Sequence, residues 1–135
     1  MTVSVEEGLY NAVKSLTTNR VYPRLPQPAT FPLIRYQRIY TSRRESVDGQ
    51  NVGITEVGMQ VDCMAETYAA AKALADSVRG VLHLYRGQWG ASTSPETHLI
   101  ARNVALETEN DMNEIDGDDR TYWVSQRYKI WTNMT

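Results

Sequence analysis

The sequence predicts an α+β domain in which helices pack on one face of a mostly antiparallel four-stranded sheet. Two segments place apolar residues at every third or fourth position, which is typical of helices that bury one side, and they cover residues 5–16 and 67–85. Four segments are rich in β-forming or alternating residues, and they cover residues 33–42, 57–65, 99–108 and 121–132. The order is helix, strand, strand, helix, strand, strand, so two hairpins flank a helix that returns the chain across the sheet.

The chain has 135 residues, the usual size of one domain, and we expect a single domain over residues 1–135. No apolar run approaches the roughly 20 residues that a membrane span needs. The N-terminal segment has early acids and no apolar stretch, so we expect no signal peptide. A net charge of -2 argues against a general nucleic-acid binder. The single cysteine, Cys63, suits a reducing compartment.

The first helix is predicted from a capping box, because Glu7 can reach back to the amide of Ser4. The residues that share its apolar face are Val5, Leu9, Ala12, Val13 and Leu16. The sequence Thr-Thr-Asn at 17–19 predicts the helix end, since Asn tolerates the left-handed conformation. Four of the five prolines lie in residues 20–32, which predicts an extended connector that is neither a helix nor a central strand.

The first strand follows this connector. Alternation would place Ile34, Tyr36 and Tyr40 on one face, although Arg38 lies on the same face and interrupts it. Residues 42–53 hold two glycines and an Asp-Gly pair, which predicts a polar hairpin loop. This loop is long for a hairpin, and longer loops often carry contacts.

The stretch GMQVDCMAETYAAAKALADSVRGVL, residues 58–82, changes from alternation to helical spacing after Glu66. The residues expected on the buried side of the strand are Val57, Met59, Val61 and Cys63. Gly58 predicts a bulge or a close backbone approach. The stripe expected on the helix is Thr67, Ala70, Ala71, Leu74, Val78, Val81, Leu82 and Tyr85. Its alanines allow close packing, and Gly87 is the expected stop.

The C-terminal half predicts a glycine- and serine-rich loop over residues 86–97, which carries Trp89, and then the third strand. The residues expected on one face of that strand are Ile100, Val104 and Leu106. Residues 109–119 are expected to form an acidic turn. The last strand carries aromatic residues on both faces, which indicates that one face of the sheet is covered by this chain and the other by something else.

Charge is segregated along the chain. Six arginines and no acid lie between Arg20 and Arg44, whereas seven acids and no base lie between Glu107 and Asp119. Two interpretations remain open at this point. The segments are either ordinary solvated loops or parts of an assembly in which opposite charges meet.

Few residues suggest chemistry. His83 and His98 do not have the spacing of a metal motif. Cys63 is expected to be a small buried residue, because it alternates in register with core positions. Residues 111–119 resemble a calcium loop, but Ile115 occupies a ligand position and no glutamate closes the loop, so an irregular cation site and a solvated hairpin both remain open. No phosphate-binding loop or nucleophile elbow is present, and we expect no enzyme, cofactor or metal.

Three segments of the sequence resemble those of small tailed-phage tail completion proteins, in the same order and over most of the chain. RVYPRLPQPATFPLIRYQRI resembles the segment that follows their first helix, and VGMQVDCMAETYAAAKALADSVRGVL resembles their strand that runs into an alanine-rich helix. YKIWTN resembles their closing strand. The motifs are structural. The chain departs from the family pattern at Arg35, at Cys63-Met64 and in the acidic residues 109–119.

The resemblance implies an α/β sandwich of helices on an antiparallel sheet, and it implies an assembly role. Such tail terminators form a homo-oligomeric ring, usually a hexamer, at the head-proximal end of the tail tube. They stop tube polymerisation and dock to the head connector or neck protein. The implied location is the virion, with the host cytoplasm during assembly. DNA would pass through the lumen without specific binding, and no membrane is involved.

Within this hypothesis the loops are expected to contact neighbouring subunits, the tube or the connector. The interface candidates are Arg43, Arg44, Glu45, Trp89, Asp111, Glu114, Asp116, Asp118 and Asp119. The basic connector of one subunit could meet the acidic turn of the next, or the acidic turn could face the lumen and repel DNA. One alternative is another neck component, such as a head-completion or connector-adaptor protein. A second is a small-ligand-binding α+β domain with a concave pocket.

Overall fold

The computed structural model describes residues 5–23, 30–45, 51–89, 99–116 and 119–132. It confirms the α+β class, but the sheet has six strands where the sequence predicted four. The elements in chain order are helix α1 (Val5–Val13), the 3-10 turn η1 (Lys14–Thr17), β1 (Val21–Tyr22), β2 (Leu33–Glu45), β3 (Asn51–Ala65), α2 (Tyr68–Leu82), β4 (Gly87–Trp89), β5 (Leu99–Asp116) and β6 (Asp119–Thr132).

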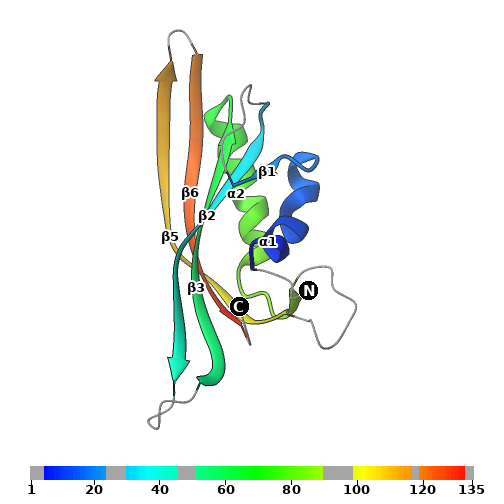
Figure 1. Cartoon of the computed structure of the whole chain (residues 1–135). Coiled ribbons are helices and arrows are strands. Elements are labelled where there is room, and N and C mark those ends of the chain that lie inside the picture. The colour runs from blue at the N-terminus through cyan, green and yellow to red at the C-terminus, as the bar shows by residue number, and fades with distance from the viewer. Residues whose placement is uncertain (1–4, 24–29, 46–50, 90–98, 117–118, 133–135) are drawn as a thin grey trace.

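The strands lie in the order β1-β2-β3-β6-β5-β4. Every neighbouring pair is antiparallel except β1 with β2, which is parallel. The two strands that the sequence did not predict, β1 and β4, are the short strands at the two edges. Both helices lie on one side of the sheet (Figure 1). We call the opposite side the open face, because no helix of the described residues covers it.

Two hairpins project beyond the helices in opposite directions (Figure 1). We call residues 37–45 and 51–60 the β2–β3 arm, and residues 108–116 and 119–127 the β5–β6 arm. The expected hairpin loop 42–53 and the expected acidic turn 109–119 are therefore wrong in large part, because Glu45 still pairs with Asn51 and Asp116 still pairs with Asp119. The buried residues at the base of each arm, such as Met59 and Val124, still face the helices. Beyond them a ribbon that no helix covers needs no apolar alternation, so its sequence resembles that of a loop.

α1 itself ends at Val13, and η1 continues the helical segment to the end that the sequence predicts at residues 17–19. Thr18 and Asn19 have φ angles of 52° and 65°, so the chain leaves η1 through the left-handed region. Ser4, the expected cap, lies outside the described residues. Helix α2 begins at the cap Thr67, whose Oγ1 accepts a hydrogen bond from the amide of Ala70 at 3.2 Å.

The buried stripe of α2 differs in part from the prediction. Its buried residues are Ala71, Leu74, Ala75, Val78 and Leu82. Ala70 and Val81, which were expected in the stripe, are exposed. The helix ends at Leu82 and the chain turns at Leu84, which has a φ of 66°, whereas the expected stop, Gly87, belongs to β4.

The core lies between the helices and the central strands. The prediction for β3 is confirmed, since Val57, Met59, Val61 and Cys63 are all fully buried. In β5 a register shift between Ala101 and Asn103 places Ala101 in the core together with Val104. The expected common face is confirmed for Val104, which is buried, and for Leu106, which packs against the core, whereas the side chain of Ile100 lies outside those that the structure describes. A bulge changes which residues face the core, and simple alternation cannot foresee it.

A second bulge, between Arg38 and Tyr40, explains the broken pattern of β2. Ile34 and Arg38 face the helices, and Tyr40 is turned to the open face, so the predicted shared face is wrong for Tyr40. Its ring lies directly over Gly58, where a Cβ atom would come within 2.2 Å of Tyr40 Cε1. The prediction of a bulge or a close backbone approach at Gly58 is therefore confirmed only in part, because the bulge lies in β2 opposite Gly58 and the close approach is made by a side chain.

Candidate interaction surfaces

The predicted interface residues lie on strands rather than in loops. Arg43, Arg44 and Glu45 belong to the end of β2, and Trp89 ends β4. Four of the acidic candidates belong to the β5–β6 arm, and these are Asp111, Glu114, Asp116 and Asp119. Asp118 lies outside the described residues. The structure thus brings the basic candidates together on one arm and the acidic candidates together on the other.

Asp111 is held within its own chain. Its Oδ1 accepts a hydrogen bond from Lys72 Nζ at 2.8 Å, and its Oδ2 accepts one from Tyr68 Oη at 2.9 Å. Both partners belong to α2. Their hydrogen bonds, that of Lys72 first, lower the pKa of Asp111, and the bond to Asp111 is the main cause that raises the pKa of Lys72. These contacts fix the base of the β5–β6 arm to the helix layer. A contact of Asp111 with another subunit stays a prediction.

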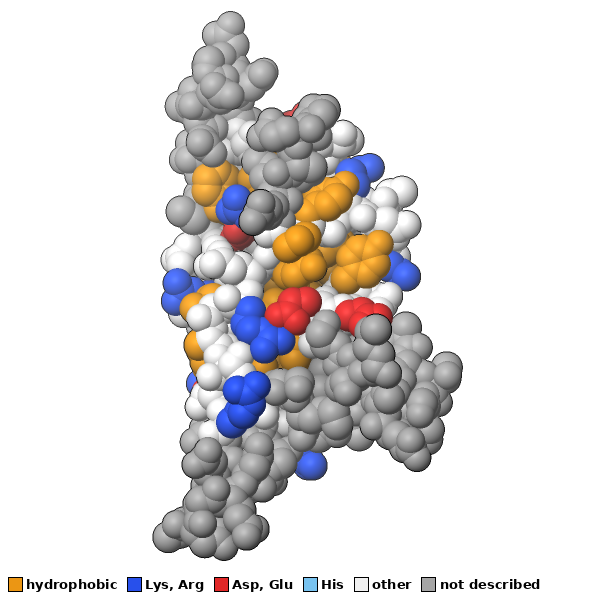
Figure 2. Space-filling model, viewed as in Figure 1, with side chains coloured by type: hydrophobic (Ala, Val, Ile, Leu, Met, Phe, Trp, Pro, Cys, Tyr) orange, Lys and Arg blue, Asp and Glu red, His pale blue; other side chains and the backbone are white. Residues whose placement is uncertain are grey.

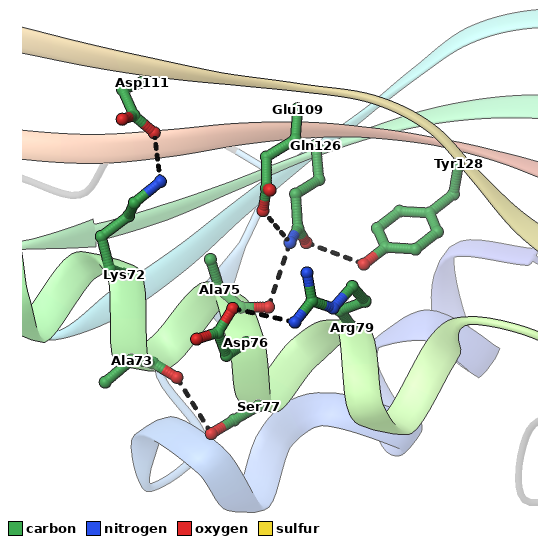
Figure 3. Close-up of polar contacts among 10 residues, drawn as sticks. All are labelled: Lys72, Ala73, Ala75, Asp76, Ser77, Arg79, Glu109, Asp111, Gln126 and Tyr128. Carbon is green, nitrogen blue, oxygen red and sulfur yellow. Dashed lines mark hydrogen bonds and ion pairs between the residues drawn. The ribbon is translucent and has the colours of Figure 1, made fainter.

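A buried polar network lies beside this tie (Figure 3). Gln126 of β6 is fully buried, and its Nε2 donates to the carbonyl oxygen of Ala75 at 3.0 Å and to Glu109 Oε1 at 2.9 Å. Tyr128 Oη donates to Gln126 Oε1 at 2.8 Å. Burial is the main cause that raises the pKa of Tyr128, so the phenol stays protonated and keeps donating. The network therefore joins α2, β5 and β6 at one point.

The segregated charges of the sequence are partly neutralised inside the chain. Arg38 forms two hydrogen bonds with Glu6 of α1, at 2.6 and 2.9 Å. Arg35 forms two with Asp62, at 3.1 and 2.7 Å, and only 4% of the Asp62 side chain is exposed. Sequence reasoning missed both pairs. The one signal was the arginine that interrupted the apolar face of β2, because a charge placed on a core face requires a partner.

Lys129 of β6 sits between two acids on the open face. Its Nζ lies 2.8 Å from Glu107 Oε1 and 3.8 Å from Glu56 Oε1, and 5.5 Å from the centre of the Trp131 ring. The bond with Glu107 is the main cause that raises the pKa of Lys129. Glu107, the first of the seven acids between residues 107 and 119, is therefore already in an ion pair with a base of its own sheet.

The open face has an interface-like composition. Trp123 and Trp131 are half-buried, and Tyr40 is 38% exposed. Arg127 is exposed in the middle of this face, on a central strand. Interfaces are enriched in aromatic residues and arginine. On the side of the molecule seen in Figure 2, hydrophobic side chains gather in the middle among separate basic and acidic ones.

The described residues offer little for catalysis or metal binding. Cys63 is fully buried, and burial is the main cause that raises the pKa of its thiol, so it is a core residue as predicted. His83 Nδ1 accepts the amide hydrogen of Leu106 at 3.1 Å. Across the part of the chain that the structure describes, no group of three or more His, Cys, Asp or Glu side chains could hold a metal ion. No helix there is long and apolar enough to cross a bilayer.

Comparisons with known proteins place these features in context. A family model described as "Tail completion protein gp17" matches residues 10–133. Curated proteins gave no match. Among solved structures, a chain described under "Virion of native gene transfer agent (GTA) particle" superposes with a TM-score of 0.57 at 15% sequence identity. The superposition covers 93% of this chain and 93% of that chain. At this identity the structural match supports the fold alone.

Proposed function

Because this chain belongs to the tail completion protein gp17 family, we propose that it forms a ring at the head-proximal end of a phage tail tube. It is a structural protein of the bacteriophage virion and not an enzyme. In the proposed role it ends tube polymerisation and joins the tail to the head connector. The observation that carries this proposal is the family match over residues 10–133, which includes every strand of the sheet. The match favours this role over that of a small-ligand-binding domain.

The geometry suits a ring subunit. The helix layer and the central strands form one body, to which ion pairs and the Gln126 network fix the arms. The two arms leave this body in opposite directions (Figure 1). A surface at one end of a subunit that fits a different surface at the other end gives a heterologous contact, which closes into a ring when the rotation allows. The proposed partners are further copies of the chain, the tail tube protein and the head connector. The proposed ring holds six copies.

Two measurements test this role. Light scattering across a concentration range should give either a constant mass near six subunits or a monomer. In both cases, adding purified tail tubes should cap one end of each tube and stop its growth. Protein that neither forms rings nor caps tubes would overturn the proposal. Binding to purified head connectors without binding to tubes would favour a different neck component.

A charge-reversal variant tests the arms. Arg43→Glu with Arg44→Glu places two acids on the β2–β3 arm. It should weaken ring formation and tube capping, because these acids would then face the acidic β5–β6 arm of a neighbouring copy. Arg79→Glu, at an exposed position of α2, is the control. Unchanged assembly in the double variant would remove these two arginines from the interface.

A further inference from the structure

Two long strands of the sheet each have an outer edge along which the described strands form little backbone pairing. β1 pairs only with Ile34 and Arg35 of β2, so no described strand pairs with the outer edge of residues 37–45. β4 pairs with β5 only over residues 99–101. The turn after α2 then covers the next part of β5, since Leu84 donates to the carbonyl of Val104 at 2.6 Å. Residues 108–116 again have no described partner on that side.

An unpaired edge presents a row of backbone donors and acceptors that fits another strand. The β5 edge has no register shift over residues 108–116, so its backbone is regular. Bulges interrupt β2 between Arg38 and Tyr40 and between Arg43 and Glu45, which leaves residues 40–43 as its regular part. Each edge therefore contains a regular stretch of at least four consecutive residues.

The charges of the two edges differ. Residues 37–45 contain three arginines, of which Arg38 is already paired with Glu6, and one acid. Residues 108–116 contain four acids, of which Asp111 is already paired with Lys72, and no base. Like charges that face each other across a strand pair are destabilising, and opposite charges are favourable. Pairing of β2 with β2, or of β5 with β5, would therefore be disfavoured. Pairing of β2 with β5 from another copy would be favoured.

The directions and positions of the edges also fit. Three successive antiparallel pairs separate β2 from β5, so these two strands run in opposite directions. Their free edges lie on opposite arms (Figure 1). Copies at the same height in a ring can join such offset edges only when the strands tilt against the ring axis. Closing a sheet on itself requires this combination of tilt and stagger.

We infer that the free edge of β5 in one copy pairs antiparallel with the free edge of β2 in the next, so that all sheets of the ring join into one closed sheet. This inference rests on the proposed ring and names the contact that forms it. It differs from a contact between loop tips, because the backbone of both arms takes part. In this shared sheet, side chains of both arms that lie on the open face of their own copy lie on one common side.

Engineered cysteines test this contact. Ser42 and Asn110 are exposed and both lie on the open face, so Ser42→Cys with Asn110→Cys places one thiol on each edge. The native Cys63 is fully buried and should not react. Within one copy β2 and β5 are three strand spacings, or about 14 Å, apart, which is too far for a disulfide. Mild oxidation, or a short bis-maleimide, should therefore link only different copies.

The inferred contact predicts a ladder of covalent multimers up to the mass of the ring. Each single variant should stop at dimers. Asn110→Cys with Ser77→Cys, on an exposed position of α2, is the control and should give no ladder. A second pair, Ser42→Cys with Thr108→Cys, tests a β2–β5 register that is shifted by two residues from the first.

The outcomes separate the two proposals. A ladder from either pair, with rings of the parent mass by light scattering, supports the shared sheet. Rings of the parent mass without a ladder from either pair would overturn the shared sheet and leave the ring standing. Folded protein, as judged by circular dichroism, that stays monomeric alone and does not cap tail tubes would overturn both.

Discussion

The network around Gln126 gives the most quantitative prediction. Gln126→Met keeps the length of the side chain and removes its hydrogen bonds. Tyr128, which is only 2% exposed, would lose the acceptor of its hydroxyl, and an unpaired buried group costs about 1–3 kcal/mol. The lost bond to the Ala75 carbonyl adds about 0.5–1.5 kcal/mol. The bond to Glu109 adds little, since that residue is exposed. We expect the free energy of unfolding to fall by about 2–4 kcal/mol.

A double-mutant cycle isolates the bond between Gln126 and Tyr128. Tyr128→Phe alone should lower the free energy of unfolding by about 1–2 kcal/mol, because Gln126 Oε1 is then buried without its donor. The double variant replaces both partners with apolar groups. Its loss should be smaller than the sum of the single losses by about 1–2 kcal/mol.

Urea denaturation followed by circular dichroism, at one fixed protein concentration, measures these free energies. Gln37→Met, at an exposed position of β2, is the matched control and should change stability by less than about 0.5 kcal/mol. The reasoning fails if Gln126→Met costs no more than this control, or if the two losses in the cycle simply add.

Three further predictions concern single sites. Gly58→Ala should lower the free energy of unfolding in urea by about 1–3 kcal/mol, because the added Cβ meets the ring of Tyr40. Gly80→Ala, whose Cβ meets nothing within 4 Å, should raise it by about 0.5–1 kcal/mol. Equal effects would contradict the close contact at Gly58. Because the pKa of Asp111 is lowered in the folded state, ionised Asp111 stabilises the fold above the unfolded carboxyl pKa of about 4. This stabilisation is lost as the pH falls through the folded pKa, so Asp111→Asn should flatten the dependence of stability on pH below about pH 4. The Cys63 thiol should react with Ellman's reagent only after unfolding, and fast reaction of the native protein would contradict its burial.

The sequence was sufficient for the parts of the fold that bury apolar surface. The alternation from Val57 to Cys63 and the helical spacing after Glu66 each match one buried face, because a period of two or of 3.6 is the direct result of covering one side of an element. The end of the first helical segment, where η1 gives way to Thr18 and Asn19, was also predictable, since few residues adopt the left-handed conformation easily.

The family resemblance that the sequence showed is confirmed by the family match over residues 10–133. The candidate interface residues were selected as members of loops, and this was wrong for those that the structure describes. Asp111 illustrates the reason. Its partner Lys72 is 39 residues away, and neither residue carries a local signal of the other.

By itself, the sequence determined which long elements carry the core and most of the core residues of β3 and α2, because burial of apolar side chains leaves a period that can be counted along the chain. Only the tertiary structure decided the lengths of the two arms, the short edge strands β1 and β4, and the bulges that turn Tyr40 and Ala101 to other faces. These features depend on backbone pairing between distant segments and on ion pairs such as Arg38 with Glu6, 32 residues apart. Hydrogen bonding between backbones is nearly independent of side-chain type, so it leaves no period in the sequence.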